Sequence, residues 1–197
     1  MAICPAPIKP DARLKDWWVE NPWHIAAKGK SLSGYERNRL YLNSRAEEFF
    51  EVSGLTGGAD SDGDGRAVVP LDFTGDGMQD LIVRQTGGGP FLMFENRLPK
   101  ANWLEVSLSG KKSNRLGIGA RLTAEFSGQK IVRELYPHNT FKSQAPARVH
   151  FGLGKAARID RLTVRWPSGL VQELREVAAN RHLRIEEDGD HRAQATP

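Results

Sequence analysis

The nine residues from Asp72 to Asp80 constrain the fold more than any other stretch of this sequence. They are Asp-Phe-Thr-Gly-Asp-Gly-Met-Gln-Asp, with three carboxylates and a hydroxyl at positions 1, 3, 5 and 9 of a short turn. Apolar β-forming residues flank the turn on both sides, at 68–71 and 81–83. This pattern predicts an acidic connection between two strands.

The spacing of these oxygen-bearing side chains favours a calcium site. Hard cations bind about six to eight oxygens, which closely spaced Asp side chains and a backbone carbonyl can supply. We expect Ca²⁺ in a structural role, favoured over Mg²⁺ because the all-oxygen cage is flexible. The expected ligands are the side chains of Asp72, Thr74, Asp76 and Asp80 and the backbone carbonyl of Met78. The alternative is a metal-free turn that uses Asp and Gly for local backbone hydrogen bonds.

A second acidic loop precedes the first, with carboxylates at Asp60, Asp62 and Asp64. Position 9 of this loop would be Val68, so the closing ligand of a calcium loop is missing. We therefore expect a solvated turn, with metal binding as the alternative.

Charge divides the chain into an acidic and a basic part. The formal net charge of +4 combines 11 Lys/Arg against 14 Asp/Glu in residues 1–99, 16 against 6 in residues 100–185, and 1 against 4 in the acidic tail at 186–197. A basic part can meet anionic partners, and it can equally be a solvated face. No apolar run is long enough to span a membrane. The N-terminus lacks the apolar core of a signal peptide, which predicts a cytoplasmic protein, or an extracellular one if a leader was removed.

Short strand signals recur from residue 37 onward, while helix signals are sparse. The chain is therefore predicted to be all-β, with a boundary near 97–100. The expected strands are 39–43, 48–52, 66–71, 79–84, 91–94, 102–109, 120–126, 130–135, 148–151, 158–165, 171–174 and 182–186.

Residues 66–94 resemble one FG-GAP (VCBS-like) repeat, the blade unit of integrin-type β-propellers. The acidic loop carries this resemblance, and residues 34–43 with 49–52 look like the outer hairpin of the same repeat. Thr74 stands where the repeat usually has Asp or Asn, which makes one ligand neutral. The chain has sequence for only one repeat, so we do not expect a closed propeller.

Residues from about 102 to 187 resemble the ASPIC/UnbV domain. The resemblance lies in Ser113-Asn-Arg-Leu-Gly-Ile-Gly-Ala-Arg121, Val149-His-Phe-Gly-Leu-Gly154, Val164-Arg-Trp-Pro-Ser-Gly169 and Val177-Ala-Ala-Asn180. Together with the preceding repeat, this order is similar to the cartilage acidic protein (CRTAC) family, which includes UnbV-type proteins of bacterial enediyne gene clusters. Leu116 replaces an acidic residue often found at its position.

The expected architecture follows from these two resemblances. It comprises an extended arm over 1–34, a single repeat over 35–98, an ASPIC/UnbV-like β domain over 99–188 and a flexible tail over 189–197. The repeat is expected as a four-stranded antiparallel blade packed with a β-sandwich-like domain. An isolated blade exposes two sheet edges, which makes a homo-oligomer through those edges a further expectation.

The sequence offers little for catalysis. The five histidines form no metal-binding pair at helical spacing, and His150 in a predicted strand is more often a satisfied, half-buried histidine than a ligand. Nucleic-acid binding is not favoured, because a basic patch is only the first of the features that it needs. We expect a non-enzymatic calcium-binding module that binds a protein or an anionic glycan. The alternative is an accessory protein of bacterial secondary metabolism that binds or processes a small molecule.

Overall fold

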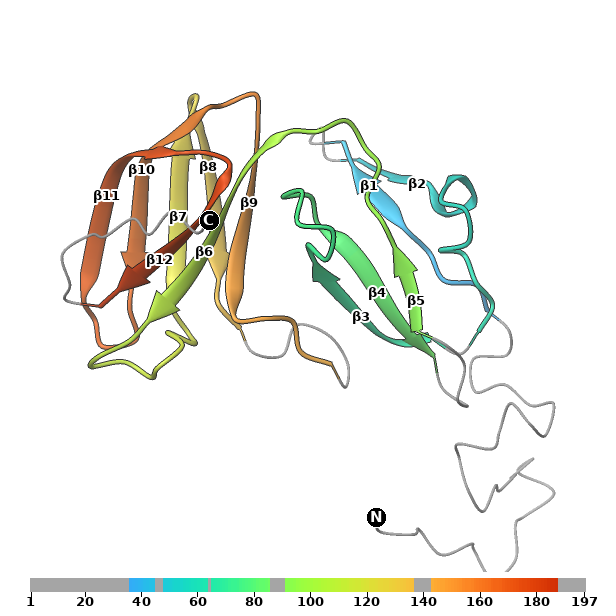
Figure 1. The fold of residues 1–197 in the computed structure, drawn as a ribbon, viewed down its shortest axis with the longest axis horizontal. Coiled ribbons are helices and arrows are strands. Elements are labelled where there is room, and N and C mark those ends of the chain that lie inside the picture. Colours follow the sequence, from blue (N-terminus) through green and yellow to red (C-terminus); the bar gives the residue numbers. More distant parts are fainter. Residues whose placement is uncertain (1–35, 45–47, 64, 86–90, 137–142, 188–197) are drawn as a thin grey trace, which may run out of the picture. The chain divides into compact units, whose positions relative to one another are not determined.

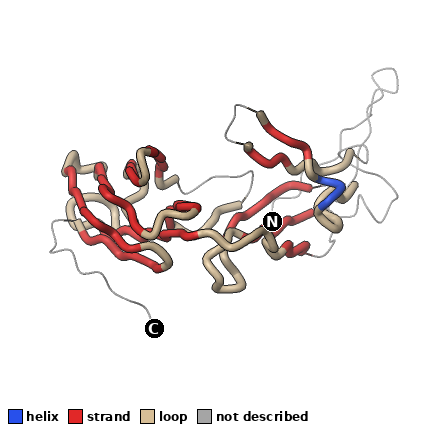
Figure 2. Tube along the Cα trace, turned by 90° about the horizontal axis from the view of Figure 1, so that it is seen from above, coloured by secondary structure: helices blue, strands red, loops and turns tan. Residues whose placement is uncertain are grey.

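The computed structural model describes residues 36–44, 48–63, 65–85, 91–136 and 143–187. Strands dominate these residues, and their helical content is a single 3-10 turn, η4, at Ser53–Leu55 (Figures 1 and 2). The all-β prediction is confirmed, and no sheet in the described part of the chain closes into a barrel or propeller. No helix among these residues is long and apolar enough to cross a membrane. The predicted arm and tail lie outside the described residues.

The chain divides into two compact units. The first contains the described residues up to Val68 together with Ile82–Phe94, and the second contains Val69–Leu81 and the described residues from Glu95 onward. The acidic loop therefore belongs to the second unit, whereas the sequence analysis placed it in the first. The reason is that its side chains and backbone contact residues of the C-terminal half, as described below.

The second unit is a sandwich of two sheets. One sheet has the order β11-β10-β7-β8 and is antiparallel throughout, and the other has the order β12-β6-β9, in which β12 and β6 are parallel. The bounds are β6 Asn102–Ser109, β7 Arg121–Phe126, β8 Gln129–Glu134, β9 Arg148–Gly154, β10 Arg158–Arg165, β11 Val171–Ala178 and β12 Arg181–Glu186.

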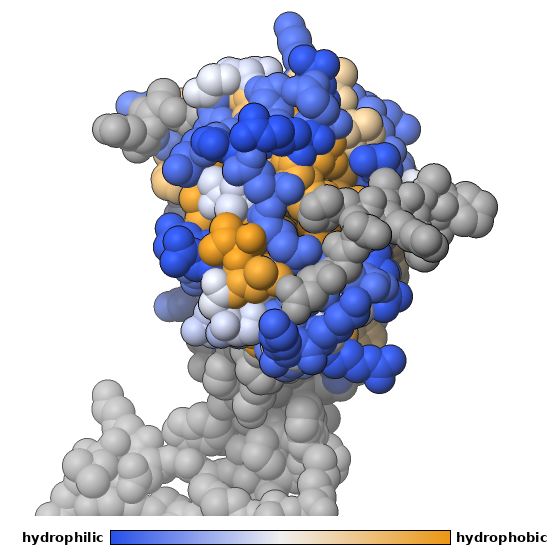
Figure 3. Space-filling model, turned by 90° about the vertical axis from the view of Figure 1, so that its left-hand side faces the viewer, coloured by the Kyte–Doolittle hydropathy of each residue, from blue (hydrophilic) through white to orange (hydrophobic). Residues whose placement is uncertain are grey.

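One apolar core holds the two sheets together. Along β7 and β9, buried side chains alternate with side chains that are at least partly exposed, because successive side chains of a strand point to opposite faces. Leu104, Phe151, Leu162 and Trp166 are among the most buried members of the single core cluster. The outward-facing residues are mostly polar, and the face shown in Figure 3 is mainly hydrophilic with a few hydrophobic patches. The expected sandwich-like domain is thus present.

A buried carboxylate closes one end of this sandwich. Glu187 directly follows β12 and is 0% exposed. Its Oε2 accepts hydrogen bonds from the backbone N–H groups of Lys111, Lys112 and Ser113 at 2.7, 2.8 and 2.7 Å. Its Oε1 accepts from the Ser113 hydroxyl at 2.8 Å and from the Ser168 hydroxyl. Burial alone would raise the pKa of this carboxyl, but the Ser168, Ser113 and Lys111 hydrogen bonds outweigh burial and lower the pKa to about 2.

The strands before residue 95 form two small sheets. β1 (Tyr41–Asn43) and β2 (Phe49–Glu51) are an antiparallel hairpin, while β3 (Gly65–Leu71), β4 (Asp80–Gln85) and β5 (Phe91–Phe94) form a three-stranded sheet. The single four-stranded blade of the sequence analysis is therefore divided into a two-stranded and a three-stranded sheet. The predicted hairpin is confirmed, but it does not extend the larger sheet.

Several apolar side chains of the first unit are exposed. Among the described residues, every member of the buried apolar core lies in the second unit, whereas Phe49, Leu55 and Phe91 are 64%, 87% and 65% exposed. The expected association through blade edges stays a prediction. It predicts a rise of apparent mass with concentration in light scattering, whereas a constant monomer mass into the micromolar range would contradict it.

Candidate metal site

The candidate metal loop, Asp72–Asp80, joins β3 to β4. Two of its glycines have left-handed backbone conformations, with φ of 75° at Gly75 and 86° at Gly77. Residues with side chains rarely adopt these angles, so the glycines allow the chain to turn sharply within a few residues. The turn points successive backbone N–H groups toward its own carboxylates.

Asp72 organises the first half of the loop. Its Oδ1 accepts hydrogen bonds from the backbone N–H groups of Gly75 at 2.7 Å and Asp76 at 3.1 Å, and its Oδ2 accepts from Gly77 at 2.7 Å. Asp is common in turns because its carboxylate can accept hydrogen bonds from the backbone N–H groups of the residues that follow it. These bonds are the ones expected of the metal-free alternative.

Asp80 closes the loop from its other end. Its side chain is only 1% exposed. Its Oδ2 accepts from the backbone N–H groups of Phe73 at 3.1 Å and Thr74 at 3.3 Å, and its Oδ1 accepts from Asn96 at 2.7 Å. A buried carboxylate requires such partners, because an unpaired buried charge is strongly unfavourable.

The Thr74 hydroxyl lies beside the carboxylates of two other predicted ligands, Asp72 and Asp80. The Thr74 hydroxyl oxygen lies 3.3 Å from Asp72 Oδ1 and also 3.3 Å from Asp80 Oδ2. Oxygens that bind one Ca²⁺ at about 2.4 Å and at right angles to each other lie about 3.4 Å apart. The chemistry and spacing of these oxygens therefore fit a hard cation. A hydroxyl has one hydrogen and can donate it to only one of the two carboxylates at a time.

Asp76 does not join this group. Its Oδ1 accepts a hydrogen bond from the backbone N–H of Met78 at 2.9 Å, and its Oδ2 lies 4.0 Å from the Lys100 ammonium nitrogen. Within the described residues, no three His, Cys, Asp or Glu side chains gather as a metal cluster. The structure thus brings together Asp72, Thr74 and Asp80, whereas Asp76 faces a lysine.

The loop lies on a small aromatic platform of the second unit, formed by Trp103 of β6 and His150 of β9. The two rings are stacked, with centroids 6.3 Å apart and an interplanar angle of 11°. His150 Nε2 is 2.9 Å from the carbonyl oxygen of Gly77, so the ring N–H donates to it in that tautomer. A β-carbon at Gly77 would overlap the Trp103 indole. His150 is half-buried and hydrogen-bonded, as the sequence analysis expected.

Charged side chains on neighbouring strands complete this region. Glu105 Oε2 accepts from Arg148 at 2.9 Å and lies 2.6 Å from His182 Nδ1, whose ring contacts Trp103 edge-on at 5.0 Å. Sequence reasoning missed this grouping, because its members come from three strands. The sequence predicted strands at 102–109, 148–151 and 182–186, but it could not show which of their residues would meet.

The second acidic loop behaves differently. The Asp60 carboxylate pairs with Arg37 at 2.8 Å, and the Ser61 hydroxyl accepts from Gln85 Nε2 at 2.8 Å and from Gly63 N at 3.1 Å. Asp62 is exposed, and Asp64 lies outside the described residues. The solvated turn expected for this loop stays a prediction.

Comparison with known proteins finds a family match in the C-terminal half of the chain. Residues 110–192 match the family described as ASPIC and UnbV. Over 156 residues the chain is 30% identical to cartilage acidic protein 1 of Xenopus tropicalis, an alignment that covers 75% of this chain and 23% of that relative. The chain thus spans less than a quarter of the length of the curated relative that it matches.

Proposed function

The chain contains an ASPIC and UnbV domain and is related to cartilage acidic protein 1, and from this premise we propose that it is a non-enzymatic interaction module stabilised by Ca²⁺. The resemblance inferred from the sequence motifs is confirmed at the level of the family. Membership of this family suggests an interaction or accessory role. The metal, the FG-GAP character of the repeat and the type of partner are parts of the proposal.

The observation that carries the metal proposal is the position of Thr74 between two carboxylates. Because one hydroxyl hydrogen cannot serve Asp72 and Asp80 together, one of the two anionic oxygens faces a lone pair. A divalent cation at this point would be bound by both carboxylates and the hydroxyl. The backbone carbonyl of Met78 and water would complete the shell, and Asp76 could join only by leaving Lys100.

The cation would stabilise more than the loop. Gly77 contacts Trp103 and His150, and Asp80 accepts from Asn96, so the loop is tied to the start of β6 and to β9. A ligand that binds only the folded state stabilises that state by mass action. We therefore propose that Ca²⁺ fixes the loop against Trp103 and His150 within the second unit and supports a rigid binding surface there. The partner would be a protein or an anionic glycan.

Thermal melts in Ca²⁺ and in EGTA test this proposal. At free Ca²⁺ about 100-fold above the dissociation constant, the melting temperature should rise by on the order of 10 °C. The Asp72→Asn variant should lose most of this rise, because one of the two carboxylates near Thr74 becomes neutral.

Asp62→Asn is the matched control, since Asp62 is exposed and has no hydrogen bond or ion pair within the described residues. It should keep the full response to Ca²⁺. An identical melting temperature in Ca²⁺ and EGTA for the wild-type protein would contradict the metal proposal. Loss of the Ca²⁺ response in Asp62→Asn would show that the cation binds at the Asp60–Asp64 loop and not at Asp72–Asp80.

A further inference from the structure

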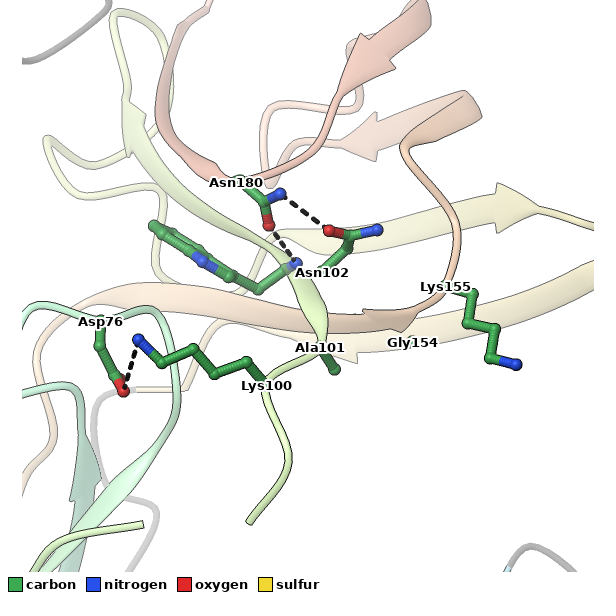
Figure 4. A pocket seen from close by; sticks show the side chains of 8 residues that line it. Asp76, Lys100, Ala101, Asn102, Gly154, Lys155 and Asn180 are labelled. Atoms are coloured by element: carbon green, nitrogen blue, oxygen red, sulfur yellow. Dashed lines mark hydrogen bonds and ion pairs between the residues drawn. The ribbon is translucent and has the colours of Figure 1, made fainter. Parts of the chain in front are cut away.

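A pocket opens beside the start of β6 and the end of β9 in the second unit (Figure 4). It has a volume of about 580 Å³ and is lined by residues 100–103, Gly154, Lys155, Asn180 and Asp76 of the metal loop. This volume lies within the range of small-ligand sites. The lining comes from segments far apart in the sequence, so only the folded second unit contains the pocket.

Two asparagines form its fixed centre. Asn180 Nδ2 donates to Asn102 Oδ1 at 2.8 Å, and Asn180 Oδ1 accepts from the backbone N–H of Trp103 at 3.1 Å. The backbone N–H of Asn180 also donates to the Trp103 carbonyl at 2.6 Å. These bonds hold both amides in place before any ligand arrives. The Asn102 amide nitrogen has no hydrogen-bond acceptor among the described residues, so it is an available donor.

Two lysines extend on opposite sides of this centre, as Figure 4 shows. The Lys155 ammonium has no carboxylate partner among the described residues, and Lys100 lies 4.0 Å from Asp76 with its side chain 80% exposed. Both are on the part of the chain, residues 100–185, that holds 16 Lys/Arg against 6 Asp/Glu. A positive field around a concave site attracts anionic ligands.

From this arrangement we propose that the pocket binds an acidic sugar unit of a glycan chain. Hydroxyl groups of the sugar would hydrogen-bond to the Asn102 and Asn180 amides, and its carboxylate or sulfate would pair with Lys155, while Lys100 on the opposite side would add to the positive field. Apart from Ala101 and Trp103 the lining has no apolar side chain, which disfavours an apolar metabolite. The inference deepens the proposed interaction role by naming its partner, and it does not require the metal.

Binding of a glucuronate-containing hexasaccharide, measured by calorimetry with saturating Ca²⁺, tests this inference. A neutral hexasaccharide and inorganic sulfate are the comparison ligands. The wild-type protein should bind the acidic sugar and neither comparison ligand at equal concentration. Lys155→Ala should weaken binding about tenfold, and Asn102→Ala by a similar factor, because each removes one charged or amide contact.

Lys111→Ala is the matched control, because it removes the same charge outside the pocket and keeps the backbone N–H that binds Glu187. It should leave the affinity within about twofold. No binding of the acidic sugar, an equal loss in Lys111→Ala, or equal binding of sulfate would each overturn the inference. If the protein does not bind the acidic sugar but its melting temperature still rises in Ca²⁺, the glycan inference is wrong and the metal proposal stands. If glycan binding is the same in EGTA as in Ca²⁺, the glycan inference is supported independently of the metal.

Discussion

Glu187→Gln should lower the melting temperature by on the order of 10 °C or more at neutral pH. The carboxylate accepts three backbone N–H groups and two hydroxyls within the buried end of the sandwich. A glutamine has one acceptor oxygen, so its NH₂ group would face donors. Buried donors that lose their acceptor are costly. Glu186→Gln is the matched control, because the side chain of this neighbour is exposed and its change should shift the melting temperature by no more than about 2 °C.

The same residue predicts a pH dependence with a definite sign. The pKa of Glu187 is lowered from 4.5 to about 2 in the folded protein, so the ionised group stabilises the fold above about pH 4.5. This contribution is lost as the pH falls from about 4.5 toward 2. Urea unfolding at successive pH values should therefore show the difference between wild type and Glu187→Gln shrinking over that window. A difference that stays constant from pH 7 to 2.5 would contradict the role of the charge.

Gly77→Ala should destabilise the second unit by about 2–4 kcal/mol in urea unfolding. Two effects add at this position. The φ of 86° is strained for a residue with a side chain, and the new methyl group would overlap the Trp103 indole. Displacing the loop would also break the hydrogen bond between His150 and the Gly77 carbonyl, so Ca²⁺ affinity should fall as well.

Gly75→Ala separates the two effects. Gly75 has a similar φ of 75°, but a β-carbon there meets nothing within 4 Å. Its cost should be about 1 kcal/mol, which is the strain alone. Equal losses in the two variants would show that the Trp103 contact contributes nothing.

Local patterns were enough to predict most strands and the acidic loop. The strand expected at 158–165 coincides with β10, and the predicted acidic loop brings the Thr74 hydroxyl close to both Asp72 and Asp80. Strand β11 is longer than expected, running to Ala178 rather than ending at 174. Glu176 has a φ of 53° there, and the alternation of buried and exposed residues along β11 is interrupted at this point.

Contacts between distant segments could not be predicted. The partners of Glu187 lie up to 76 residues away, so the sequence showed only an acidic residue near an acidic tail. Asp76 was expected to bind the metal because its spacing fits, but Lys100 beside it became visible only in the folded chain. The pocket likewise depends on Asn102 meeting Asn180. The spacing of residues within one loop can be read from the sequence, whereas contacts between distant segments depend on how the strands of the sandwich are arranged.

The Thr74→Asp variant tests the central claim, a Ca²⁺ site at the loop, most directly. It places a third carboxylate beside Asp72 and Asp80, so repulsion should lower the melting temperature in EGTA. The added charge should also strengthen Ca²⁺ binding, by about tenfold in a calorimetric titration. If the loop binds Ca²⁺, the variant should therefore be less stable than the wild-type protein in EGTA but should bind Ca²⁺ more tightly. A variant that is destabilised in both conditions and shows no heat of Ca²⁺ binding would contradict the account and favour a metal-free turn.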